Sequence, residues 1–256
     1  SRKQLLLIVA LFPLAFMVFG FMVEPPEAIL RGLIAILTSR DTLITDYIGL
    51  GGMGAAFVNA GLLTLMAITV YYFSGAEIGG AAVACLFLVL GFGLFGKNVL
   101  NVWFIVLGVY LFARFKKEPF AAHINTAFFG AALAPIFSEI LFSSALSLGV
   151  SLPLSILTTL VIGFVLVPVA AQLFKVHMGF TLYNIGFAAG IIGTIVVALY
   201  KSYGFVPDPV FIWTAGNNVL LGTLLAVIFS SAALGGFVLD RRALAAEAWI
   251  MRQPGQ

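Results

Sequence analysis

Long apolar stretches separated by short polar segments run through almost the whole chain. Most of these stretches reach the ~20 residues that a helix needs to cross a bilayer. They predict eight transmembrane helices, at residues 5–22, 48–73, 78–95, 99–115, 121–143, 152–174, 178–200 and 217–239. Residues 27–38 follow two helix-stopping prolines and are too short and too charged to cross, which predicts a re-entrant or interfacial amphipathic helix. The pattern therefore indicates an all-α fold, a polytopic membrane helix bundle.

Composition excludes several classes of function. Hydrophobic residues make up 62% of the chain and charged residues only 9%, whereas a soluble domain carries about a quarter charged residues. The single cysteine, Cys85, excludes an internal disulfide and a cysteine-based metal site. The sequence contains no phosphate-binding loop, no convincing nucleophile–base spacing and no basic cluster interleaved with aromatic residues. We therefore expect neither an enzyme nor a nucleic-acid-binding protein, and no cofactor.

Lysine and arginine residues are distributed unequally between the two predicted sides of the membrane. If residues 27–38 do not cross, the side of the N-terminus receives Arg2, Lys3, Arg114, Lys116, Lys117, Lys175, Arg241, Arg242 and Arg252. The opposite side receives only Arg31, Arg40, Lys97 and Lys201. Because cytoplasmic loops carry an excess of Lys and Arg, both termini are predicted to be cytoplasmic.

One short polar motif occurs twice inside the apolar stretches. Met, Gly, Asn and Gly recur at a constant offset of 125 residues, first as Met53, Gly54, Asn59 and Gly61 and then as Met178, Gly179, Asn184 and Gly186. The predicted helices that carry the two copies run in opposite directions, as in inverted-repeat transporters. The single membrane domain, residues 1–256, is accordingly divided into a first helix with the short amphipathic helix (1–45), a first repeat (46–143), a second, partial repeat (152–239) and a polar tail (240–256). The repeat is degenerate.

The repeated asparagines are the main candidate site residues. A carboxamide both donates and accepts hydrogen bonds and can replace water around a small polar solute. The flanking glycines remove side chains and let backbone carbonyls approach. With Asn125 as a third related asparagine, the predicted substrate-binding set is Asn59, Asn184, Asn125, Gly54, Gly61, Gly179, Gly186 and Tyr183. The alternative is that these residues are interhelical contacts, each typically contributing ~0.6 kcal/mol.

Glu139 and His123 are the candidate coupling residues. An ionisable residue at membrane depth is a functional hypothesis by default, and Pro135 frees a backbone carbonyl close to Glu139. The alternatives are a surface position that lets Glu139 reach water, and interfacial capping by His123. Asp41 and Asp46 precede the second predicted span, where they indicate helix capping or an external vestibule. So few ligands predict no metal site.

Two stretches of the chain carry a resemblance to known families. Residues 46–61 and 182–190 resemble the signature of a bacterial family of polytopic membrane proteins, a domain of unknown function with an internal Asn-x-Gly repeat. This resemblance covers most of the chain and implies a bacterial inner membrane, but it implies no known activity. Residues 57–63 and 123–130 are more weakly similar to the urea-transporter fold. The proline that this fold has after its asparagine is missing after Asn59, and its Tyr-Asn-Gly triplet is only approximated, so urea itself is not implied.

Together these features predict a transporter or channel that passes a small polar solute or ion through a midplane site between the repeats. The expected partners are the lipid bilayer, the solute or ion, and either further copies of this chain or a partner membrane subunit. The competing hypothesis is a non-transporting structural subunit of a membrane complex, in which the asparagines and glycines are packing contacts.

Overall fold

The computed structural model describes residues 2–42, 44–178, 184–205 and 212–239. Regular structure in these residues is helical, apart from one isolated β-bridge between Asp46 and Phe95. The chain divides into two compact units, Ser1–Trp213 and Thr214–Gln256. The first unit contains α1 (Arg2–Val23), α2 (Pro26–Thr38), α3 (Tyr47–Gly51), α4 (Met53–Ser74), α5 (Gly80–Phe92), α6 (Trp103–Lys116), α7 (Ile124–Gly130), α8 (Pro135–Leu141), α9 (Leu148–His177) and α10 (Asn184–Ser202), and the second contains α11 (Asn218–Leu239).

Five of the described helices are long and apolar enough to cross a membrane: α1, α4, α9, α10 and α11. They correspond to the predicted spans at residues 5–22, 48–73, 152–174, 178–200 and 217–239. A sixth span results if the bent pair of α7 and α8 counts as one. The all-α class and the membrane assignment are thus supported, whereas the predicted count of eight spans is not confirmed.

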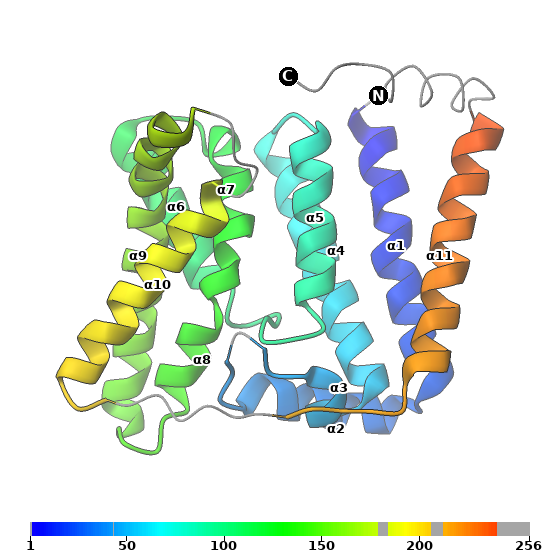
Figure 1. Ribbon diagram of the computed structural model, residues 1–256, viewed down its shortest axis with the longest axis horizontal. Helices are drawn as coiled ribbons and strands as arrows, with labels where there is room; N and C mark the ends of the chain where they lie inside the picture. Colours follow the sequence, from blue (N-terminus) through cyan, green and yellow to red (C-terminus); the bar gives the residue numbers. More distant parts are fainter. Residues whose placement is uncertain (1, 43, 179–183, 206–211, 240–256) are drawn as a thin grey trace. The chain divides into compact units, whose positions relative to one another are not determined.

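The difference in the count arises mainly at α5 and α6, which were expected as two complete spans. With 13 and 14 residues, each helix is about 20 Å long, less than the ~30 Å of a hydrocarbon core. Figure 1 shows α5 running from the end of the unit where α4 finishes to the loop at residues 93–102, and α6 returning to that end. Residues 80–116 therefore form a helical hairpin in which neither helix is long enough to cross, and we refer to it as the re-entrant hairpin and to residues 93–102 as the re-entrant loop.

The predicted span at 121–143 is a broken helix. Its two halves are bent by 45° at Pro135, which is the first residue of α8. Proline has no backbone N–H and its ring clashes with the preceding turn, so the helix cannot continue straight through this position. The carbonyl oxygen of Ala131, which a residue with an N–H at position 135 would bond, accepts a hydrogen bond from the N–H of Ala134 instead (2.9 Å).

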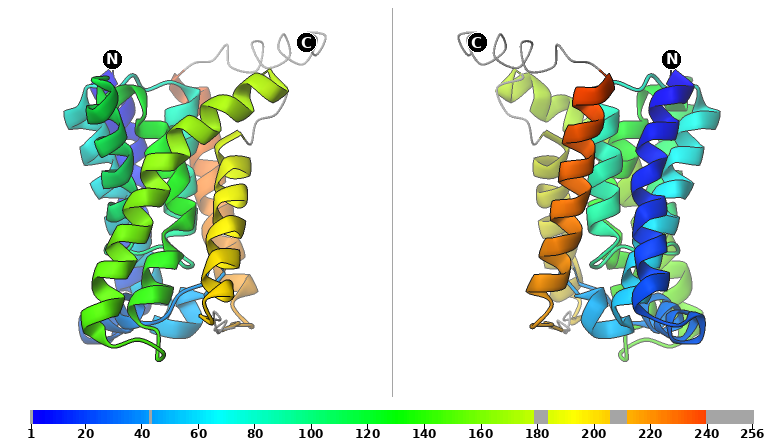
Figure 2. Two further views of the ribbon diagram at one scale, coloured as in Figure 1. Left: turned by 90° about the vertical axis from the view of Figure 1, so that its left-hand side faces the viewer. Right: turned by 90° about the vertical axis from the view of Figure 1, so that its right-hand side faces the viewer.

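The short helix predicted from residues 27–38 is present as α2 and does not span. Figures 1 and 2 show α2 and α3 at the end of the unit where α1 finishes and α4 begins. α2 buries Ile29, Gly32 and Ile36 while Arg31 stays exposed. A Cβ on Gly32 would lie only 1.9 Å from the carbonyl oxygen of Gly51, so only glycine permits this packing of α2 on α3.

The two helices that carry the repeated motif run in opposite directions within the first unit. In Figure 1, α4 starts at the end of the unit that holds α2, whereas α10 starts at the other end. This agrees with the antiparallel placement that the sequence predicts. The division into repeats at 46–143 and 152–239 stays a prediction.

Candidate functional site

Asn59 holds the re-entrant loop at residues 93–102. Its Nδ2 donates to the carbonyl oxygens of Gly93 (2.7 Å) and Lys97 (3.0 Å), and its Oδ1 accepts from the N–H of Val99 (3.2 Å). Asn59 is fully buried. Buried backbone groups outside a helix need partners, and this one amide supplies three of them. Gly93 permits the close approach, because a Cβ there would lie 2.5 Å from the Cα of Ala60.

Two further asparagines shape the same loop. The Oδ1 of Asn98 accepts from the N–H groups of Leu100 (3.0 Å) and Asn101 (2.9 Å), while the Oδ1 of Asn101 accepts from the N–H of Asn98 (3.0 Å). Both side chains are fully buried. Their Oδ1 atoms are thus used inside the loop, and their Nδ2 groups are directed mainly at other segments.

Those Nδ2 groups meet the carboxylate of Asp41, in the loop between α2 and α3. Its Oδ2 lies 3.1 Å from Asn98 Nδ2 and 3.3 Å from Asn101 Nδ2, and it accepts a third hydrogen bond from the Tyr47 hydroxyl at 3.0 Å. Asn101 Nδ2 also donates to Ser138 Oγ on α8 at 3.1 Å. We refer to Asp41, Tyr47, Asn98, Asn101 and Ser138 as the Asp41 cluster. It joins the 39–46 loop, the re-entrant loop and the broken helix.

The two oxygens of Asp41 differ sharply. Oδ1 is buried and has no hydrogen-bond partner among the described residues, whereas Oδ2 has three donors. Only 1% of the residue is exposed. Burial raises the pKa of Asp41 to about 7, against the lowering effect of the Tyr47 and Ser138 hydroxyls. Strongly shifted pKa values of this kind cluster at functional sites, which makes Asp41 a candidate site residue.

Lys97 is a second buried ionisable residue of the re-entrant loop. It is 3% exposed, and its Nζ lies 4.5 Å and 4.9 Å from the ring centroids of Phe92 and Phe95. Aromatic faces attract a cation that has lost its water. Burial lowers the pKa of Lys97 to about 8, and the nearby charge of Asp41 opposes this shift.

Beside the Asp41 cluster, an ion pair connects the 39–46 loop to α8. The Arg40 Nη2 lies 2.6 Å from the Glu139 Oε1, and 16% and 11% of the two side chains are exposed. Glu139, the predicted coupling residue, is therefore mostly buried and paired with a residue 99 positions away. Because Glu139 also lines the cavity described next, both its coupling role and its alternative as a residue that reaches water stay predictions.

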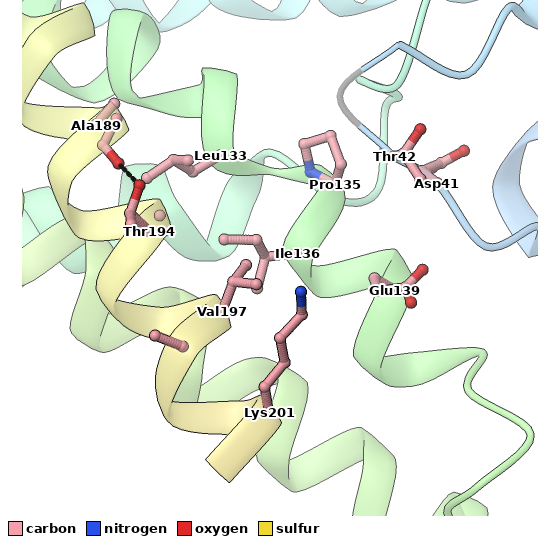
Figure 3. A pocket seen from close by; sticks show the side chains of 13 residues that line it. Asp41, Thr42, Leu133, Pro135, Ile136, Glu139, Ala189, Thr194, Val197 and Lys201 are labelled. Atoms are coloured by element: carbon pink, nitrogen blue, oxygen red, sulfur yellow. Dashed lines mark hydrogen bonds between the residues drawn. The ribbon is translucent and has the colours of Figure 1, made fainter. Parts of the chain in front are cut away.

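A cavity of about 630 Å³ lies between this loop, α8 and α10 (Figure 3). Its charged lining residues are Asp41, Glu139 and Lys201, and Figure 3 shows the Lys201 side chain extending from α10 into the space beside α8. The other lining residues are small or apolar apart from two threonines: Thr42, Leu133, Pro135, Ile136, Ala189, Gly190, Gly193, Thr194, Val197 and Ala198. The cavity leads to the Asp41 cluster.

Comparison with protein-family models identifies the family of the chain. A model for a protein of unknown function, DUF1576, matches residues 25–202. The chain belongs to this family. The matched region contains the 39–46 loop, the re-entrant hairpin, the broken helix and all residues that line the cavity. Comparison with curated proteins and with solved structures gives no match, and the weaker similarity to the urea-transporter fold stays a prediction.

The structure does not bring the two repeated asparagines together. Asn184 lies at the first residue of α10, where its Oδ1 is 2.8 Å from the Nε2 of His177. Figure 1 places the start of α10 and the start of α4, which carries Asn59, at opposite ends of the first unit. Of the other predicted residues in the second copy, Gly179 and Tyr183 lie outside the described residues, and Gly186 has open space where a side chain would be.

The glycines of the first copy pack α4 against the N-terminal part of the chain. A Cβ on Gly54 would lie 2.7 Å from Glu24 Cβ, just after α1, and a Cβ on Gly61 would lie 2.7 Å from the carbonyl oxygen of Pro13 within α1. This corresponds to the packing interpretation of the motif. The two copies are therefore alike in sequence and different in surroundings.

The remaining predicted residues lie near the opposite end of the re-entrant hairpin. Asn125 accepts a hydrogen bond from the Tyr71 hydroxyl and links α7 to α4. His123 pairs with Glu118 at 2.6 Å just before α7.

Asp46, the second aspartate before α4, has a capping role. Its carboxylate accepts from the N–H of Ile48 at 2.9 Å and so caps α3, as the sequence predicts. The two aspartates of the 39–46 loop therefore differ in role, since Asp41 belongs to the buried cluster.

Sequence reasoning missed most of the Asp41 cluster because residues 96–98 were interpreted as a connecting loop between two spans. The available signal was the combination of short apolar runs on both sides with a lysine and two asparagines in five residues, 97–101. A solvent-exposed loop does not require such a pattern, whereas a buried loop needs side-chain amides to satisfy its backbone.

Proposed function

We propose that the protein moves a small polar solute or ion across the membrane and that the Asp41 cluster is the central part of its binding site. The observation that carries this proposal is the meeting of three irregular segments, the 39–46 loop, the re-entrant loop and the break before α8, at buried ionisable residues. Irregular backbone at membrane depth is tolerated where it is buried in protein or lines a water-filled cavity. Ionisable residues there mark substrate and ion pathways.

The cavity supports a small ligand. Its volume of about 630 Å³ falls within the ~300–1,000 Å³ of typical ligand sites. Its walls are mostly apolar, and its few polar groups are concentrated at Asp41, Thr42, Glu139 and Lys201. Such a site orients a solute by a few polar contacts at one side. In this proposal Asn59 is a positioning residue that holds the re-entrant loop, because its amide is already bonded to backbone groups.

The distribution of charge supports one orientation. Among the described residues, Arg2, Lys3, Arg114, Lys116, Lys117 and Lys175 lie near the end of the first unit where α1 begins. Arg31, Arg40 and Lys201 lie toward the other end. We therefore propose that the N-terminal end is cytoplasmic and that the Arg40–Glu139 pair and Lys201 face the outer side.

Solute flux into proteoliposomes tests this function. The full chain is reconstituted, and uptake of a panel of small neutral, cationic and anionic solutes is compared among wild type, Asp41→Asn and Asp46→Asn. Both variants replace a carboxylate with its amide, and asparagine still caps a helix well. We expect selective uptake by wild type and Asp46→Asn, with a loss of at least about tenfold in Asp41→Asn.

Two outcomes would contradict the proposal. Uptake that is equal in the two variants would place the site away from Asp41. No uptake of any solute by the folded wild type would favour the structural subunit that the sequence leaves as the alternative.

A further inference from the structure

The unequal surroundings of the two Asp41 oxygens indicate that this carboxyl group can bind a proton. As a carboxylate, Asp41 leaves the lone pairs of Oδ1 buried without a donor, while Oδ2 accepts three hydrogen bonds. A buried acceptor without a partner is destabilising. A proton on Oδ1 removes the charge, and the carbonyl oxygen Oδ2 keeps its accepted hydrogen bonds. Neutralising Asp41 therefore does not require the cluster to rearrange around Oδ2.

Some of the groups around Asp41 stabilise its carboxylate form, and others stabilise its neutral form. The hydroxyls of Tyr47 on α3 and Ser138 on α8 stabilise the carboxylate, and from the re-entrant loop the Lys97 cation does so through its charge. From α8, Glu139 favours the neutral acid, and Arg40 pairs with it. Burial opposes the carboxylate as well, so the balance between the two states lies close to neutral pH. On α10, the cation of Lys201 lines the same cavity.

A proton also has a route to this carboxyl group. Asp41 and its neighbour Thr42 line the cavity of about 630 Å³, which is far larger than the ~30 Å³ that one water molecule occupies. Water in the cavity brings protons to the residue. Asp46, in the same loop, is not among the lining residues and caps α3 instead. Asp46 therefore serves as a control carboxylate that does not line the cavity.

We propose that Asp41 is a proton-binding group that couples a proton to the solute carried at this site, an inference that rests on the proposed transport function. In the binding step a hydronium ion in the cavity gives up a proton to Asp41, so that one of its O–H bonds breaks and an O–H bond forms at Oδ1. In the release step the same bond breaks, and the proton returns to water on the other side of the membrane. No electrons are transferred, and in each step one O–H bond breaks as another forms.

Infrared difference spectroscopy of the full chain in lipid tests proton binding without any solute. We expect a protonated-carboxyl band that grows as the pH falls from about 8 to about 6. The band disappears in Asp41→Asn and remains in Asp46→Asn. In Tyr47→Phe the midpoint moves up by about one pH unit, because the carboxylate loses a hydrogen-bond donor. This last variant keeps the test decisive if Asp41→Asn does not fold.

A second measurement tests the coupling. The solute identified by the flux panel is used for this measurement. An inward proton gradient imposed on proteoliposomes should increase uptake by wild type several-fold, and it should not change the rate of uptake by Asp41→Asn. A carboxyl band that persists in Asp41→Asn, or a Tyr47→Phe midpoint that does not move, would overturn proton binding at Asp41. If the carboxyl band changes with pH but uptake does not depend on the proton gradient, the coupling alone would be overturned. An absence of all uptake would overturn the transport function.

Discussion

The Arg40–Glu139 ion pair shows how single residues far apart in the sequence hold the site together. Its atoms lie 2.6 Å apart, and both side chains are mostly buried. In such surroundings, removing one partner leaves a buried charge without compensation, whereas replacing both with apolar residues of similar volume is often nearly neutral. The pair therefore fixes the 39–46 loop on α8 more than it adds net stability.

This view predicts a non-additive pair of substitutions. Arg40→Met and Glu139→Met should each lower the free energy of unfolding by about 3 kcal/mol, while the double variant should lose less than either single variant. Chemical unfolding in lipid–detergent micelles, followed by tryptophan fluorescence, measures the difference. Additive losses in the double variant would contradict the account.

At the residue scale, the sequence indicated which residue types form polar contacts, but it did not identify the residues that they contact. An asparagine and a glutamate inside apolar stretches indicate that polar partners exist, and both expectations agree with Asn59 and Glu139 as the structure shows them. Their partners, however, are the backbone of a loop 34 to 40 residues away and an arginine 99 residues away. Such long-range pairings depend on the fold and leave no local spacing to recognise.

At the scale of elements, the positions of the apolar helices could be predicted and their lengths could not. Residues 78–95 and 99–115 are apolar over enough of their length to be counted as spans, yet α5 and α6 have only 13 and 14 residues. The glycines and polar residues at 93–101 end both helices early. The disturbance of the helical backbone at Pro135, in contrast, could be predicted, because the effect of proline is local.

The repeated glycines give a matched test at this scale. Gly61 and Gly186 occupy equivalent positions in the two motif copies, but an added Cβ meets the Pro13 carbonyl oxygen at 2.7 Å in the first and nothing within 4 Å in the second. Gly61→Ala should destabilise the protein by about 1–3 kcal/mol through overpacking. Gly186→Ala should be neutral or slightly stabilising, since alanine favours a helix.

Unfolding of the two variants, measured side by side in the same micelles, checks this difference. Equal effects of the two substitutions would mean that the α1–α4 contact in the first copy is not as close as described. The result would bear on the packing role of the motif and not on the Asp41 cluster.

At the scale of the whole molecule, we propose that the polar site is reached from the side of the membrane opposite the N-terminus. Within the first unit, the cavity lies among the 39–46 loop, α8 and α10, and the Lys and Arg residues favour a cytoplasmic N-terminal end. The direction of the helices that carry the motif agrees with the sequence-based prediction. The convergence of loops on Asp41 could not be predicted, because it depends on contacts between distant segments.

Thiol labelling in sealed vesicles of known orientation tests this proposal most directly. In a Cys85→Ser background, Thr42→Cys places a thiol in the cavity lining, and Thr64→Cys places one in the core of α4, where Thr64 is 1% exposed. We predict that a membrane-impermeant reagent modifies Thr42→Cys from the extracytoplasmic side and leaves Thr64→Cys unmodified. A Thr42→Cys thiol that reacts from neither side, or only from the side of the N-terminus, would contradict the account.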